Sequence, residues 1–263
     1  MSSPVDGHHA RRRFGQNFLA DPHVIRDIIA CVSPGAADHV LEIGPGLGAL
    51  TRPLLGTEAR LTVIEIDRDL AARLTREFDP EPRFRLVQAD ALTVRFDSLV
   101  APGGQLRLVG NLPYNITTPL LLHALDQLDV VQDLHVMVQR EVALRLAALP
   151  GGGDYGRLGI ACQACCEVEC LLDVPPESFE PAPSVFSSVV RLRPRQGRPS
   201  PTQLRRLGEI TQLAFSQRRK MIRQTLGKHF PSELLASLDV PLTARAEEIP
   251  VAAYLALAAC PLA

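Results

Sequence analysis

A glycine-rich turn in the N-terminal third constrains the fold of this 263-residue chain more than any other feature. The turn, residues 42–48 (E-I-G-P-G-L-G), follows the strand-like run 39–41 and precedes a helical stretch that extends toward Leu55. Glycines permit positive φ angles and let the backbone approach a ligand closely. The spacing is G-x-G-x-G, whereas dinucleotide-binding turns have G-x-G-x-x-G. The turn therefore indicates a ligand at a strand-to-helix junction, but alone it does not identify that ligand.

Polar residues stand at the ends of three further strand-like runs. Glu65 lies at the end of run 61–66, Asp90 follows run 84–88, and Asn111 follows the apolar residues 106–109. Ligands of open α/β sheets bind outside the carboxyl ends of the strands. The ordered series suits S-adenosylmethionine, whose sulfonium needs no phosphate cradle, and Glu65 is placed to bind its ribose diol. Glu65 or Asp90 taken singly fits a solvated strand-end carboxylate equally well.

The tetrapeptide Asn111-Leu112-Pro113-Tyr114 predicts methyl transfer to an exocyclic amine. The nitrogen of such an amine, N6 of adenine for example, is a poor nucleophile because its lone pair is delocalised into the ring. The Asn111 amide oxygen and the Leu112 carbonyl could accept its two N–H groups and stabilise the developing positive charge. Tyr114 would stack on a base that is flipped or already unpaired. The alternative is a plain strand-to-loop turn with a proline and a buried tyrosine.

Five segments of the chain resemble, in order, motifs of the bacterial small-subunit rRNA adenine dimethyltransferases. They are residues 13–19, the glycine turn, residues 111–115, residues 175–185 and residues 215–220. The resemblance runs from about Arg11 to the C-terminus. The family is similar in kind to the erythromycin-resistance rRNA methylases and to the mitochondrial transcription factor B proteins. The resemblance implies that two adjacent adenosines in the 3′-terminal stem-loop of 16S rRNA each receive two N6 methyl groups from S-adenosylmethionine, within an immature small ribosomal subunit.

The same resemblance implies the residues of the cofactor site. Asn17 and Leu19 would contact the methionine part of S-adenosylmethionine beside Gly44 and Gly46. Glu65 would bind the ribose, Asp90 the adenine amine, and Asn111 both cofactor and target. No strong general base is required, because the amine proton can be lost to water after transfer.

A proline-rich segment, residues 174–183, carries Phe179. Each proline fixes its own φ, so the segment is stiff and can hold the ring at a set position. A flipped adenine could lie between Phe179 and Tyr114, and such stacking is worth roughly 1–3 kcal/mol per base. Alternatively, Phe179 fills the core beneath a loop. Where the family often has a lysine two residues before a small acidic-type position, this chain has Ser184 and Phe186, which removes support for a phosphate contact there.

Two basic groups are candidates for RNA binding, and the formal net charge of −1 requires any such surface to be a local patch. The first is an N-terminal arm with Arg11, Arg12 and Arg13. The second consists of Arg218, Arg219, Lys220 and Arg223, of which the last three are predicted to lie on one flank of a helix. Arginine suits bidentate phosphate contacts. Each group can also be a tail or a solvated face.

The order of elements predicts a Rossmann-like class I methyltransferase fold of the α/β class, with a mostly parallel sheet. Strand-like and helical stretches alternate to about residue 149, and residues 189–192 look like a late antiparallel strand that finishes the sheet. Asp21 and Pro22 predict the start of a helix. Apolar residues recur at helical spacing after residue 204. We predict a basic arm over residues 1–20, a methyltransferase domain over 21–195 and a small helical domain over 196–263.

Four cysteines at helical spacing raise the question of a metal: Cys162, Cys165, Cys166 and Cys170. The segment lacks a second paired knuckle, so we predict core packing on a helix and no metal. The longest apolar run, residues 251–260, is too short to cross a bilayer, and no signal sequence is apparent. These features predict a cytoplasmic protein, which we expect to be monomeric.

Two other function classes remain to be weighed. A nicotinamide oxidoreductase is disfavoured by the spacing of the glycine turn and by the tetrapeptide. A non-catalytic RNA-binding assembly or transcription factor is disfavoured as a complete account by intact Glu65, Asp90 and Asn111, although an assembly role can coexist with catalysis.

Overall fold

The computed structural model describes residues 16–260, so the predicted arm residues Arg11, Arg12 and Arg13 lie outside the described part. Contacts divide the chain into two units, of which the first runs through Ala143 and adds Glu169–Arg193. The second unit consists of Leu144–Val168 and of the residues from Pro194 onward. The sequence predicts a domain boundary at residue 196. That the chain folds as two independent domains divided there stays a prediction.

The first unit is built on a seven-stranded sheet with the order β4-β3-β2-β5-β6-β9-β7. Its strands, in chain order, are β2 (His39–Ile43), β3 (Arg60–Glu65), β4 (Phe84–Gln88), β5 (Leu106–Asn111), β6 (Val131–Gln139), β7 (Cys166–Val174) and β9 (Ser187–Pro194). The five strands from β2 to β6 pair in parallel, and β9 runs antiparallel to β6. The predicted α/β fold with a mostly parallel sheet and an antiparallel late strand is confirmed. The late strand does not finish the sheet, however, because β7 lies beyond it.

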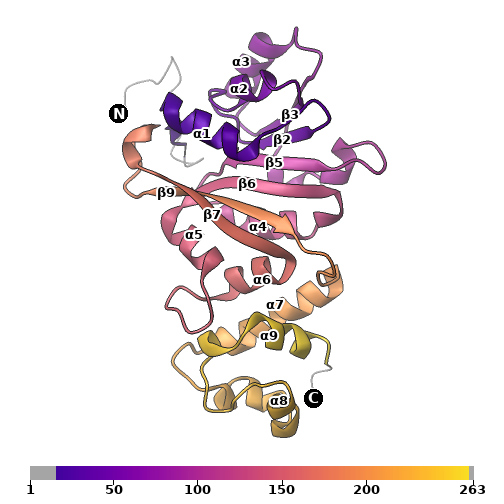
Figure 1. Cartoon of the computed structure of the whole chain (residues 1–263), viewed down its shortest axis with the longest axis vertical. Coiled ribbons are helices and arrows are strands. Elements are labelled where there is room, and N and C mark those ends of the chain that lie inside the picture. Colours follow the sequence, from indigo (N-terminus) through magenta and orange to yellow (C-terminus); the bar gives the residue numbers. More distant parts are fainter. Residues whose placement is uncertain (1–15, 261–263) are drawn as a thin grey trace. The chain divides into compact units, whose positions relative to one another are not determined.

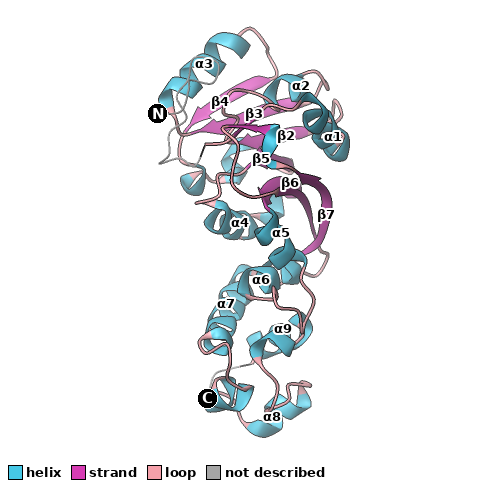
Figure 2. Ribbon diagram, turned by 90° about the vertical axis from the view of Figure 1, so that its left-hand side faces the viewer, coloured by secondary structure: helices cyan, strands magenta, loops and turns pink. Residues whose placement is uncertain are grey.

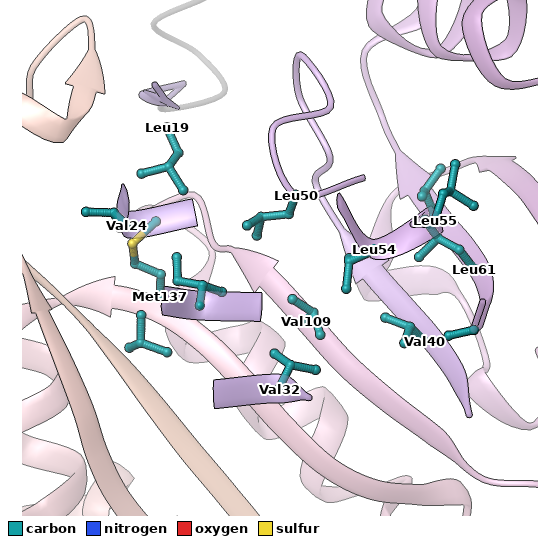
Figure 3. Close-up of a cluster of buried hydrophobic side chains, with 14 of the residues drawn as sticks. Leu19, Val24, Val32, Val40, Leu50, Leu54, Leu55, Leu61, Val109 and Met137 are labelled. Carbon is teal, nitrogen blue, oxygen red and sulfur yellow. The ribbon is translucent and has the colours of Figure 1, made fainter. Parts of the chain in front are cut away.

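Both faces of the parallel strands are buried, which explains their nearly continuous apolar sequences. Val40 and Leu41 point to opposite faces of β2, and neither is exposed to solvent. On one face, α1 (Pro22–Val32) and α2 (Thr51–Leu55) cover the sheet, and α4 (Thr117–Leu125) lies on the other side (Figure 2). Figure 3 shows the first of these layers, in which Val24, Leu54 and Val109 belong to one apolar cluster. The sheet is thus a rigid support for the loops at its carboxyl edge.

The direction of chain travel reverses at β2. From β2 the chain moves through α2 to β3 and through α3 (Arg68–Phe78) to β4, and it then returns to place β5 on the opposite side of β2. In open α/β sheets such a switch point creates a crevice at the carboxyl ends of the two central strands. The glycine turn leaves β2 and the tetrapeptide ends β5, so both lie at this crevice.

A short two-stranded pairing ties the segment before α1 to the proline-rich segment. β1 (Phe18–Leu19) pairs antiparallel with β8 (Phe179–Glu180), and the Ala20 N–H donates to the Ser178 carbonyl at 2.8 Å. Directly afterward α1 begins as predicted, because the Asp21 carboxylate accepts the N–H of His23 at 2.8 Å.

The second unit is helical. It contains α6 (Arg157–Cys165), α7 (Pro201–Phe215), α8 (Ser232–Ser237) and α9 (Val251–Ala258), and α6, α7 and α9 pack against one another. Two buried tyrosines hold its loops, since Tyr155 donates to the Ile249 carbonyl at 2.9 Å and Tyr254 to the Ala246 carbonyl at 2.8 Å. A remaining helix, α5 (Arg140–Ala147), follows β6 and crosses the boundary between the units.

Two helix predictions were wrong. The cysteine stripe does not lie on one helix, because α6 ends at Cys165 and residues 166–174 pair with β9 as β7. Cys170 is consequently exposed, while Cys162, Cys165 and Cys166 are buried. Among the described residues, no group of three or more histidine, cysteine or acidic side chains could hold a metal ion. No helix in the described part is both long and apolar enough to cross a membrane.

The second wrong prediction concerns the basic group, which is not helical. α7 ends at Phe215, residues 216–220 form turns, and a 3₁₀ turn follows at Ile222–Gln224. The Ile222 N–H donates to the Ala244 carbonyl at 2.7 Å and the Arg223 N–H to the Leu242 carbonyl at 3.0 Å. These long-range partners take the backbone donors that a continued helix would have used.

Candidate functional site

A cavity of about 150 Å³ lies at the carboxyl edge of the sheet, entirely within the first unit. Its wall brings together the residues predicted from sequence to bind cofactor or target amine: Asn17, Leu19, Gly44, Gly46, Glu65, Asp90, Asn111, Leu112, Pro113 and Tyr114. These residues come from the segment before α1, from the glycine turn and from the ends of β3, β4 and β5. The switch point of the sheet explains why such distant residues share one cavity.

The glycine turn has a backbone that only glycine adopts readily. Gly44, Gly46 and Gly48 have φ angles of 67°, 57° and 82°. A Cβ atom added at Gly46 would also lie 3.1 Å from the ring of Phe18. The turn therefore depends on glycine both for its conformation and for the close approach of the segment before α1.

Glu65 is a buried carboxylate with a fixed orientation. Its side chain is 5 % exposed, so the alternative of a solvated strand-end carboxylate does not hold here. Oε1 accepts the Asp67 N–H at 2.8 Å and Oε2 accepts the Gly46 N–H at 3.3 Å. Burial raises the pKa of Glu65, and the two backbone donors oppose that rise. This carboxylate links the end of β3 to the glycine turn and faces the cavity.

Asp90 is less restrained than Glu65. It is half-buried, and its Oδ1 accepts the Leu92 N–H at 2.9 Å as the cap of a short 3₁₀ turn. This bond aligns the carboxylate at the cavity wall. Local capping accounts for one oxygen of Asp90, so a ligand contact through the other stays a prediction.

Asn111 is positioned by a residue from the opposite wall. Its amide nitrogen Nδ2 donates to the Asn17 carbonyl at 2.9 Å. Because the nitrogen is used in this bond, the amide oxygen Oδ1 is the atom that remains to accept an N–H from an incoming amine. Leu112 is buried and its N–H donates to the Met137 carbonyl at 3.1 Å, which ties the tetrapeptide to β6. Both residues lie at the cavity, and their roles as acceptors for the target amine stay predictions.

Like Phe18, Tyr114 is an aromatic residue that lines the cavity. Its hydroxyl lies 2.8 Å from the hydroxyl of Ser187 at the start of β9, and burial raises its pKa. Phe179, by contrast, is 4 % exposed and packs in the apolar cluster beside Leu19. Its ring is not among the cavity-lining residues. This placement matches the alternative of a core residue, so stacking by Phe179 stays a prediction that requires its ring to be uncovered.

Two cavity residues received no role from the sequence. Glu42, 2 % exposed, accepts a hydrogen bond from the Thr51 hydroxyl at 2.7 Å, and burial raises its pKa to about 8. Ile66, the residue after Glu65, is an exposed apolar side chain on the cavity wall. In the sequence, Glu42 could have been recognised as an acidic residue near the end of an apolar strand, just before the glycine turn. An apolar side chain just past a strand end was the signal for Ile66.

The basic loop, defined as Arg218, Arg219, Lys220 and Arg223, lies in the second unit and is exposed. Arg218 pairs with Glu247 at 3.3 Å and also donates to the Gly153 carbonyl. Among residues 16–260, the other three cations form no ion pair. They therefore retain their donors for an anionic ligand, whereas Arg218 is partly engaged.

The chain is similar to known proteins over almost its whole length. Residues 7–260 match the family model described as ribosomal RNA adenine dimethylase. The chain is 49 % identical over 252 residues to the ribosomal RNA small subunit methyltransferase A of Pseudomonas aeruginosa, covering 95 % of this chain and 94 % of the relative. It is 48 % identical over 253 residues to the protein of the same name from Marinobacter nauticus, covering 96 % and 91 %. Among solved structures it is similar to a dimethyladenosine transferase from Plasmodium falciparum, with a TM-score of 0.78 and 25 % identity over 91 % of this chain and 95 % of that one.

Proposed function

The chain belongs to the ribosomal RNA adenine dimethylase family, and from this premise we propose the reaction that its cavity performs. It transfers methyl groups from S-adenosylmethionine to N6 of two adjacent adenosines in the 3′-terminal stem-loop of 16S rRNA, giving N6,N6-dimethyladenosines. The observation that carries the proposal is the bond from Asn111 to the Asn17 carbonyl, which aligns an amide oxygen beside the glycine turn. The substrate is the rRNA of an immature small subunit, and we expect the enzyme to act as a monomer in the cytoplasm.

The cavity has the donors and acceptors that S-adenosylmethionine requires. Glu65, already oriented by two backbone N–H groups, binds the ribose diol. Asp90 would accept a hydrogen bond from the adenine amine, and the exposed side chain of Ile66 on the cavity wall would pack against the adenine ring. Asn17, Leu19, Gly44 and Gly46 surround the methionine part. When bound, the cofactor supplies an electrophilic methyl group on its sulfonium.

The tetrapeptide prepares the target nitrogen. Asn111 Oδ1 and the Leu112 carbonyl accept the two N–H groups of the adenine amine and stabilise the positive charge that develops on nitrogen. Tyr114 stacks on the base, and its bond to Ser187 orients the ring. After transfer the surplus proton leaves to water, so no side chain is needed as a strong base.

Phosphate contacts come from the basic loop and from the arm residues Arg11, Arg12 and Arg13. Arg219, Lys220 and Arg223, which form no ion pair with residues 16–260, can each neutralise a phosphate, and such contacts support affinity without reading sequence. A separate non-catalytic role in subunit assembly is compatible with this surface.

The proposal is tested by mapping methylation in cells. A strain that lacks its own dimethyltransferase is complemented with this chain or with its Asn111→Ala variant, and its 16S rRNA is digested and analysed by mass spectrometry. We expect two adjacent dimethyladenosines with the native chain and unmodified adenosines with the variant. Unmodified rRNA with the native chain would refute the proposed substrate. Calorimetry with NAD, for which we expect no binding, addresses the oxidoreductase alternative.

A further inference from the structure

An exposed aromatic side chain lies next to the residue that holds Tyr114. Phe186 is 47 % exposed, although large apolar side chains of this unit are mostly buried. The next residue, Ser187, is fully buried and its hydroxyl lies 2.8 Å from the Tyr114 hydroxyl. Phe186 is thus the sequence neighbour of Ser187, whose hydroxyl contacts Tyr114 of the proposed target site.

The backbone at Phe186 is held in place by the sheet. The Arg140 N–H donates to the Phe186 carbonyl at 2.9 Å, directly beyond the last register pair of β6 and β9, Gln139 with Ser187. An exposed ring on a backbone with a long-range hydrogen bond needs less ordering when it binds a partner. This arrangement distinguishes Phe186 from a residue on a free loop.

Arg140, which donates its N–H to the Phe186 carbonyl, also carries a positive charge. The side chain of Arg140 is 54 % exposed, and its Nε lies 3.6 Å from Asp173 Oδ2. The other oxygen of Asp173 accepts the Ser188 hydroxyl at 2.6 Å, which restrains this carboxylate. Arg140 therefore keeps most of its guanidinium donors for a phosphate while Asp173 limits its movement. Phe186 and Arg140 are thus joined by a backbone hydrogen bond, and aromatic rings together with arginine are the groups with which proteins bind unpaired nucleotides.

We propose that Phe186 and Arg140 bind the nucleotide adjacent to the target adenosine, with its base stacked on the Phe186 ring and its phosphate at Arg140. This inference rests on the proposed function, in which two adjacent adenosines are methylated. The neighbour of an adenosine held beside Tyr114 is one nucleotide away along the RNA, and Phe186 has an exposed aromatic ring one residue from Ser187, the hydrogen-bond partner of Tyr114. The family often has a small acidic-type residue at the position of Phe186. The exposed aromatic ring is therefore a property of this chain that membership of the family does not supply.

The test uses immature small-subunit particles in which one target adenosine is retained and its neighbour is either adenosine or uridine. Steady-state methylation is measured with the native chain, Phe186→Ala and Phe186→Tyr, and with Leu149→Ala as a control for loss of another exposed apolar side chain. With adenosine as neighbour, we expect Phe186→Ala to raise KM about five- to tenfold at similar kcat, the low end of the range for base–aromatic stacking. Phe186→Tyr and Leu149→Ala should behave as the native chain.

The neighbour substitution separates stacking from packing. Uridine, which stacks less well, should raise the KM of the native chain severalfold and leave that of Phe186→Ala almost unchanged. Equal loss by the variant on both particles, or loss of kcat together with cofactor affinity, would overturn the inference by showing a packing role through Tyr114. A defect with particles that disappears on protein-free rRNA would assign the ring to a ribosomal protein and also overturn it. Particles that the native chain fails to methylate would refute the proposed function itself.

Discussion

Replacing Glu65 with alanine tests the cofactor site most directly. The carboxylate is buried, and in the free protein it accepts the N–H groups of Gly46 and Asp67. In the proposed complex it also accepts two hydroxyl groups of a ribose. The substitution removes the ribose contacts and leaves two backbone donors without their acceptor, so it should affect both ligand affinity and the free energy of unfolding.

The magnitude follows from the kind of bond that is lost. A hydrogen bond to a charged group contributes about 1.5–3 kcal/mol net. Loss of two such bonds predicts about 3–6 kcal/mol of binding free energy, which is roughly a 140- to 20,000-fold rise in Kd at 1.4 kcal/mol per factor of ten. Each backbone N–H left unsatisfied costs about 1–3 kcal/mol, so the loss of folding stability is about 2–6 kcal/mol, or about 1–3 kcal/mol when water reaches one of the two groups. Glu65→Gln keeps the shape and one acceptor oxygen, so its Kd should lie between these limits.

The assay is isothermal calorimetry with S-adenosylmethionine, combined with urea unfolding of each variant. Asp97→Ala is the matched control, because Asp97 is an exposed carboxylate paired with Arg95 outside the cavity. It should bind the cofactor as the native chain does. A folded Glu65→Ala protein with unchanged affinity would show that this carboxylate only braces the glycine turn, and the ribose assignment would have to be abandoned.

Three further predictions concern the target amine, the RNA surface and the second buried acid. Asn111→Ala should lower kcat at least about a hundredfold in a single-turnover methylation assay while RNA affinity is retained, because the amide acts on charge that develops during transfer; near-normal turnover would exclude that role. Neutralising Arg219, Lys220 and Arg223 together should make the slope of log affinity against log salt shallower by roughly 2–3 units, at about 0.7–0.9 per lost contact, and an unaltered slope would leave the loop as a solvated face. The pKa of Glu42 is raised from 4.5 to about 8 by burial, so the stability that its neutral form contributes is present below pH 4.5 and is lost as the pH rises through 8. Between pH 5 and 9 the ligand-free native chain should therefore lose up to about 5 kcal/mol of unfolding free energy that Glu42→Gln does not lose, at 1.4 kcal/mol per pKa unit. Urea unfolding of both proteins across this pH range measures the difference. Parallel pH profiles of the two proteins would show that Glu42 ionises without a cost in stability.

The sequence by itself determined the elements whose signals are local. The Asp21 cap opens α1, because a carboxylate can accept the first free N–H groups of a helix without help from elsewhere. The glycine turn adopts positive φ angles because its residues lack a Cβ. Glu65 and Asn111 could be assigned to one cavity because the carboxyl ends of parallel strands meet at one edge of a sheet. Each of these inferences depends on backbone chemistry or on a general rule of chain topology.

Only the tertiary structure decided where local patterns stop. Cys166 begins a strand, although its spacing from Cys162 suits a helix, because residues 166–174 find a partner in β9. The segment of the basic loop leaves its helical pattern because Leu242 and Ala244, distant in sequence, accept the N–H groups of Arg223 and Ile222. Phe179 is buried and Phe186 is exposed, a difference that no local pattern predicts for two phenylalanines in one segment. Strand pairing and burial depend on contacts between residues that are distant in sequence, and a periodic pattern records only the near ones.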